Sequence, residues 1–166
     1  LPYPGGPVIE KFAAQVGFED VFKYPRLTHN NLDFSFSGIK TAVLYSLVEL
    51  GAYDLKTKKF LKPDDQELIN TVSSSLLVCV ADVFERRLNL ALKKYPDVKA
   101  ITFVGGVACN KYIKTRLLEF AQNNNLNFYS PTPKYCTDNG AMIAFVGHYL
   151  AQQNKFDDYS LDIKLG

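Results

Sequence analysis

The chain has 166 residues, a length that suits one compact domain with a substantial core and leaves little room for two. With 47% hydrophobic and 22% charged residues and a formal net charge of +2, it has the composition of an ordinary soluble globular protein, and its overall charge gives no reason to expect a nucleic-acid partner. Its three cysteines include no CxxC pair, which favours a reducing compartment. No apolar run reaches the roughly 18 residues of a membrane helix, and no secretory signal is present. Together these features predict a cytoplasmic location without membrane contact.

The chain opens with a glycine turn that leads into a helix. Gly5-Gly6 form the turn, Pro7 suits the first helical position, and apolar residues then recur at helical spacing up to Gly17. Glu10 lies one turn inside this helix. Its position alone indicates a solvated carboxylate near the positive end of the helix dipole.

The next third of the chain is less regular. Residues 18–31 show no period and are predicted to be a loop, whereas the alternation of apolar and polar residues from Leu32 to Ser37 predicts a short strand. Apolar residues at helical spacing from Ile39 to Leu50 predict a second helix. The lysine-rich stretch 53–63 reads as an exposed connection.

A long helix is predicted in the middle of the chain. Asp64 to Glu67 make a good helix opening, and one apolar face then continues until Tyr95-Pro96, which is long enough to cross a small domain as core scaffolding. Cys79 lies within this apolar pattern and is expected in the core. A buried strand at 99–104, an amphipathic helix and another short strand at 126–129 follow.

The turn at Gly105-Gly106 is the first candidate binding element. Ligands of open α/β sheets bind beyond the carboxyl ends of the strands, where this turn lies. Glycines let the backbone approach a ligand closely, and the first turn of a helix offers unpaired N–H groups to it. Asn110 either supplies directional hydrogen bonds to that ligand or caps the following helix, and the motif alone leaves both open.

A second candidate lies at Cys136 to Gly140, before a helix at 141–152 that is apolar nearly all round and is therefore predicted to be buried. Asp138 is either the N-cap of that helix, shared with Thr137, or a ligand of a hard metal ion, and spacing alone favours the cap. His148 reads as a core histidine. No GxSxG, Walker or HExxH motif is present in this sequence, and no residue is identified as a general base.

Four motifs occur in order along the chain, and together they resemble the TsaD family of tRNA threonylcarbamoyltransferases. They are Tyr3-Pro-Gly-Gly-Pro7, Asp33-Phe-Ser-Phe-Ser-Gly-Ile-Lys-Thr-Ala-Val43, Gly105-Gly-Val-Ala-Cys-Asn110 and Cys136-Thr-Asp-Asn-Gly-Ala-Met-Ile-Ala144. The likeness runs from Leu1 to about Gly147. It implies an α/β fold of the actin-like ATPase (ASKHA, ribonuclease-H-like) class. Residues 1–153 would form the carboxyl-terminal lobe only, with 18–64 as a helical and loop insertion and 154–166 as a polar tail.

The resemblance also implies roles for particular residues. Gly6, Gly105, Gly106 and Asn110 would contact ATP or threonylcarbamoyl-AMP, and Glu10 would lie at the ribose. Asp138 would bind one divalent iron or zinc ion together with a His-x-x-x-His pair of an amino-terminal lobe. That lobe is absent from this sequence, which begins at Leu1 without an initiator Met and is expected to be the middle of a longer protein, so that the isolated portion would be inactive.

The activity implied is transfer of the threonylcarbamoyl group from its adenylate to N6 of the adenosine beside the anticodon, in tRNAs that read codons starting with A. Besides tRNA, a TsaB-like paralogue and a TsaE-like ATPase are the expected partners. The location would be the cytoplasm or, alternatively, a mitochondrion or plastid. Two other functions stay open: a non-catalytic nucleotide-binding scaffold, and a sugar-kinase-like phosphotransferase of the same superfamily.

Overall fold

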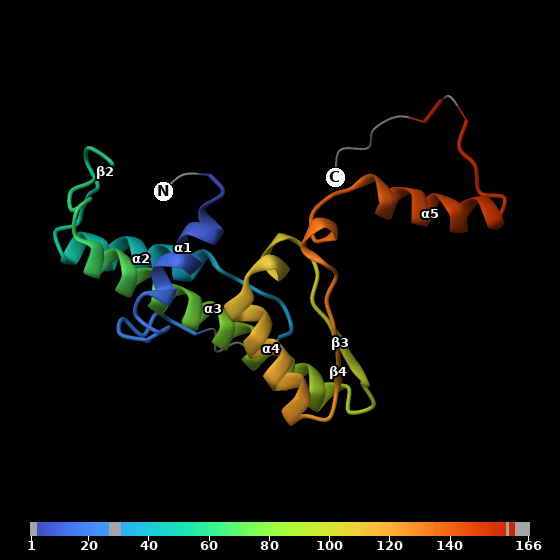
Figure 1. Cartoon of the computed structure of the whole chain (residues 1–166), viewed down its shortest axis with the longest axis horizontal. Helices are drawn as coiled ribbons and strands as arrows, with labels where there is room; N and C mark the ends of the chain where they lie inside the picture. Colours follow the sequence, from blue (N-terminus) through green and yellow to red (C-terminus); the bar gives the residue numbers. More distant parts are fainter. Residues whose placement is uncertain (1–2, 27–30, 159, 162–166) are drawn as a thin grey trace.

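The computed structural model describes residues 3–26, 31–158 and 160–161. It is a mixed α/β structure in which one long helix, α3 (Gln66–Lys94), packs against both α1 (Gly5–Ala14) and α4 (Lys111–Asn123). Figure 1 shows α2 (Ser37–Glu49) near the start of α3 and the two strands of a parallel pair near its end. The predicted α/β class is therefore confirmed.

Helix α3 begins and ends where the sequence predicts. The carboxylate of Asp65 accepts a hydrogen bond from the backbone N–H of Leu68 at 3.0 Å, and Tyr95 follows the last helical residue. One 18-residue window of this helix has a mean hydropathy of 1.5, so by length and composition it could also cross a membrane, which corrects the expectation that no run is apolar enough. Because 44% of that window is buried and the helix packs against α1 and α4, we interpret α3 as the core helix of the fold.

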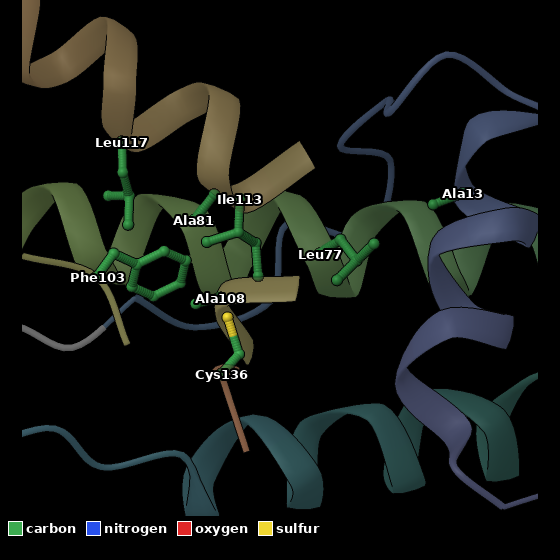
Figure 2. Close-up of a cluster of buried hydrophobic side chains, with 8 residues drawn as sticks. All are labelled: Ala13, Leu77, Ala81, Phe103, Ala108, Ile113, Leu117 and Cys136. Atoms are coloured by element: carbon green, nitrogen blue, oxygen red, sulfur yellow. The ribbon is translucent and has the colours of Figure 1, made fainter. Parts of the chain in front are cut away.

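The main hydrophobic core lies where α1, α3, α4 and the turn after the first parallel strand meet (Figure 2). Its buried members are Ala13, Leu77, Ala81, Phe103, Ala108, Ile113, Leu117 and Cys136. Cys79 is fully buried in a second cluster beneath α2, as predicted. Helix α1 starts earlier than expected, because Gly5 and Gly6 are its first two residues rather than a turn before it.

The described part of the predicted loop 18–31 contains no helix or strand, and α3 holds it through polar contacts. The buried hydroxyl of Ser74 donates to the carbonyl of Glu19 at 2.7 Å. Arg26 pairs with Asp82 of α3 at 2.8 Å, and Arg116 of α4 reaches the same carboxylate at 3.0 Å. Asp82 thus links the loop, α3 and α4 in one partly buried network.

The predicted strand at 32–37 is wrong, whereas the stretch 53–63 is a largely exposed connection as predicted. Residues 32–36 form no strand, and the rings of Phe34 and Phe36 instead stack on each other and pack against Phe84 of α3. The alternation of apolar and polar residues therefore reflects two rings that pack against a helix and not a strand in a sheet. The stretch 53–63 contains a small antiparallel hairpin, β1 (Tyr53–Asp54) and β2 (Lys59–Phe60), within the connection that leads to α3.

The strands predicted at 99–104 and 126–129 are present and pair in parallel. Strand β3 (Ala100–Thr102) lies beside β4 (Asn127–Tyr129), with Ile101 opposite Phe128, and α4 makes the connection between them. Parallel pairing needs such a crossover. The glycine turn begins three residues after the carboxyl end of β3, so the fold places that turn at the edge where ligands of such sheets bind.

The last helix, α5 (Gly140–Gln152), has the predicted extent but not the predicted burial. None of its residues is buried, and Figure 1 shows it extending away from the other helices. His148 is exposed as well and is not a core histidine. The large apolar side chains at its surface are Met142, Ile143, Phe145, Val146, Tyr149 and Leu150. The apolar pattern identified a helix that needs a partner surface, and the described part of the chain does not supply one.

Candidate functional site

The amino terminus of α4 is held by two side chains from distant parts of the sequence. Oδ1 of Asn110 accepts from the N–H of Ile113 at 2.9 Å, so Asn110 is the N-cap of this helix. Oε1 of Glu10 in α1 accepts from the N–H groups of Lys111 at 2.7 Å and Tyr112 at 3.0 Å. Glu10 is therefore not merely a solvated carboxylate. The first three N–H groups of α4 are already in use, and any ligand donors must come from elsewhere.

Those donors lie in the glycine turn itself. Gly105 has φ +86° and ψ 176°, a conformation that essentially only glycine adopts. A short 3-10 helix, η1 (Gly106–Cys109), follows it and leads to Asn110. Within the described residues, the N–H groups of Gly106 and Val107 donate to no acceptor, because the hydrogen bonds of this turn begin with Ala108. The turn thus offers two adjacent backbone donors to a ligand.

The segment that carries Asp138 lies next to this turn. A Cβ added to Gly106 would lie 4.0 Å from Cγ2 of Thr137. The N-cap of α5 is Asn139, whose Oδ1 accepts from the N–H of Met142 at 3.1 Å, so the prediction that Thr137 and Asp138 cap this helix is wrong. Asp138 is exposed, and its carboxylate has no hydrogen-bond or ionic partner in the described part of the chain.

An unpartnered carboxylate is a suitable oxygen ligand for iron or zinc. Among the described residues, however, no group of three histidine, cysteine, aspartate or glutamate side chains lies close enough together to hold a metal ion. Asp138 therefore suits a metal ion as one of its ligands. A complete coordination set would need further ligands from outside this part of the chain.

A pocket of about 550 Å³ opens between α1 and α4. Its polar lining includes Glu10, and its apolar lining includes Phe18 and Tyr112, whose rings stack with centroids 4.0 Å apart. Gly6 lies one helical turn before Glu10, on the same face of α1. Space beside the Gly6 Cα is open, and its backbone is ordinary helix, so neither packing nor conformation within the described chain requires glycine there.

Two cysteines also meet at this site, which the sequence analysis did not predict. Cys109 ends η1 and is exposed, whereas Cys136 is buried beside it. Burial raises the pKa of the Cys136 thiol, and the nearby Cys109 thiol raises that pKa further. The signal available in the sequence was that each cysteine lies within a candidate ligand-binding motif, at Gly105–Asn110 and Cys136–Gly140.

The structure thus brings most of the predicted site residues into two neighbouring groups. Glu10 and Asn110 meet at the start of α4, and Gly106 lies beside the segment of Asp138. Gly6 joins the first group only through its position on α1. Asn139 and the Phe18–Tyr112 pair are further residues of this region that sequence reasoning missed.

Comparison with known proteins gives these residues a context. Residues 1–145 match the family TsaD, described as tRNA N6-adenosine threonylcarbamoyltransferase. Proteins with that name are 34% identical over 98% of the chain in Brachyspira hyodysenteriae, 37% identical over 100% in Dictyoglomus turgidum and 36% identical over 98% in Staphylococcus aureus. The chain spans about half the length of these curated relatives, between 44% and 47%. The chain belongs to the TsaD family.

Proposed function

We propose that this chain is the carboxyl-terminal lobe of an actin-like protein that transfers a threonylcarbamoyl group to tRNA. The observation that carries this proposal is the match to the TsaD family over residues 1–145, which includes all the predicted site residues. The neighbouring positions of the glycine turn and of the Asp138 segment support it, because both motifs would then face one ligand.

The first part of the proposed site binds the nucleotide. The free N–H groups of Gly106 and Val107 suit phosphate oxygens, and the amide Nδ2 of Asn110 remains available because the helix uses only Oδ1. Glu10 likewise keeps Oε2 available for a ribose hydroxyl while Oε1 holds α4. The open space beside Gly6 lets a ligand approach the backbone of α1. The pocket between α1 and α4 has the volume of a small-molecule site and would receive the adenosine end.

Asp138 is proposed to contribute one ligand to a divalent iron or zinc ion. Its exposure and its lack of a protein partner support this role. Such an ion, when bound, would polarise oxygens of the carbamoyl or phosphate group. The remaining ligands would come from the part of the full-length relatives that this chain does not match. The exposed apolar surface of α5, which starts two residues after Asp138, would pack against that same part.

The reaction exchanges one bond for another. N6 of the adenosine next to the anticodon forms a bond to the carbamoyl carbon, the bond from that carbon to the adenylate phosphate oxygen breaks, and AMP leaves while N6 loses a proton. The residues described here would hold the adenylate and tRNA in register, which can supply much of the rate. A TsaB-like paralogue and a TsaE-like ATPase are the proposed partners, in the cytoplasm.

Incorporation of labelled threonine into unmodified tRNA tests this proposal. The assay uses the protein at its natural length with its partner proteins, bicarbonate and ATP. We expect label in tRNAs that read codons starting with A and none in other tRNAs. A protein that binds ATP but labels no tRNA with competent partners would instead be a nucleotide-binding scaffold, and phosphate transfer to a sugar would identify a kinase-like enzyme.

A further inference from the structure

Cys109 and Cys136 lie close together although they are 27 positions apart in the sequence. The Cys136 sulfur contacts the carbonyl oxygens of Pro131 and Thr132, each at 3.6 Å, and the Cys109 sulfur contacts the carbonyl oxygen of Pro133 at 3.8 Å. Both sulfurs therefore lie against the same three-residue segment.

The backbones that carry the two thiols are packed against each other. Cys136 and Ala108, the neighbour of Cys109, belong to one buried cluster, and Figure 2 shows the Cys136 sulfur pointing toward Ala108. The two cysteines differ in exposure, since Cys109 is open to solvent and Cys136 is buried. The third cysteine, Cys79, is fully buried within another cluster. This arrangement joins an accessible attacking thiol to a protected partner.

We propose that Cys109 and Cys136 form a redox-active thiol pair that low-molecular-weight disulfides such as oxidised glutathione convert to an intramolecular disulfide. The Cys109 thiolate attacks one sulfur of the small disulfide, forms a mixed disulfide and releases one thiol. The Cys136 thiolate then attacks the Cys109 sulfur, forms the protein disulfide and releases the second thiol. Two protein thiols are oxidised and one small disulfide is reduced to two thiols, so electrons and protons balance.

The bond would tie η1 to the segment that precedes α5. Asn110 directly follows Cys109, and Asp138 lies two residues after Cys136, so the disulfide would fix these two side chains relative to each other. That consequence rests on the proposed function, whereas the formation of the bond does not. The pair is therefore tested by its chemistry and not by activity.

The test is oxidation of the folded protein with oxidised glutathione, followed by alkylation of free thiols, trypsin digestion and mass spectrometry. Lysines at 99, 111, 134 and 155 release Cys109 in the peptide 100–111 and Cys136 in the peptide 135–155. We expect these two peptides to be joined by a disulfide that dithiothreitol reverses, with Cys79 unmodified as an internal control. Cys136→Ser should stop at a glutathione adduct on Cys109, and Cys109→Ser should leave Cys136 unreacted.

Three results would overturn the proposal. They are a wild-type protein that keeps a stable glutathione adduct on Cys109, dimers linked through Cys109 between two chains, and rapid modification of Cys136 in the Cys109→Ser variant. Circular dichroism of each serine variant confirms that it is folded before oxidation. Serine is close in size to cysteine, so the fold should tolerate the change at the exposed position.

Discussion

The carboxylate of Glu10 accepts a hydrogen bond from the backbone N–H of Lys111 at 2.7 Å, across 101 positions of sequence. The same oxygen accepts from Tyr112, so a side chain of α1 satisfies two of the N–H groups that the start of α4 leaves unpaired. A carboxylate is well suited to this place because it also complements the positive end of the helix dipole. This contact fixes α1 and α4 on either side of the pocket between them.

Replacing Glu10 tests how much this contact stabilises the fold. We expect Glu10→Ala to lower the free energy of unfolding by about 2 kcal/mol, since backbone donors lose a charged acceptor. Glu10→Gln should recover much of that loss because its amide oxygen can still accept. Urea unfolding measures both, with Glu119→Ala on the exposed side of α4 as the control. Equal stability of Glu10→Ala and Glu119→Ala would show that the contact has no energetic weight.

Replacing Gly6 with alanine distinguishes an effect on folding from an effect on ligand binding. It is the second residue of α1, and Gly38 is the second residue of α2, with open space beside both. Alanine at either position should leave stability unchanged or raise it by up to about 1 kcal/mol. Only Gly6→Ala should weaken ATP binding, by about tenfold in a calorimetric titration. Unchanged ATP affinity in Gly6→Ala would remove Gly6 from the proposed site.

The two glycines of the central turn should behave differently in folding. Alanine at Gly105 must adopt φ +86°, which we expect to cost about 1–3 kcal/mol. Gly106 has no such backbone, and its added Cβ meets its nearest atom at 4.0 Å, an ordinary contact. Thermal unfolding should therefore show a clear loss for Gly105→Ala and a small change for Gly106→Ala. The reverse order would mean that the turn differs from the one described.

Asn110 combines a cap with a proposed ligand contact, and two variants separate them. Asn110→Ala should lose about 1 kcal/mol of stability, whereas Asn110→Ser retains a capping oxygen and should stay near wild type. Both variants lack the amide donor, so both should lose ATP affinity. If Asn110→Ser binds ATP as the wild type does, Asn110 acts only as the helix cap.

The sequence predicted the elements and contacts that depend on residues close together in the chain. The cap by Asn110 could be anticipated because its acceptor and the Ile113 donor lie three residues apart. Glu10 could not be paired with α4, because nothing local distinguishes it from a solvated carboxylate. The same limit explains the cysteine pair, which is brought together only by the packing of η1 against the segment before α5.

The pattern of apolar residues predicted the positions of helices and strands better than it predicted which surfaces pack against them. The period of α5 was correct, yet its burial was wrong because periodicity reports which faces are apolar and not which surface meets them. At 32–37, alternation placed Phe34 and Phe36 on one side, as a strand would, but their partner is Phe84 of a helix. The roles of Gly6, Glu10, Gly105, Gly106, Asn110 and Asp138 toward a ligand stay predictions.

The most direct test of the account supplies threonylcarbamoyl-AMP itself to the protein at its natural length and follows transfer to unmodified tRNA in a single turnover. Wild type is compared with Asp138→Ala and with Asp97→Ala, a change at another exposed carboxylate in a loop. We predict transfer by wild type and Asp97→Ala, and a loss of about a hundredfold or more in folded Asp138→Ala. Undiminished transfer by Asp138→Ala, or no transfer by the wild type with its partners, would contradict the account.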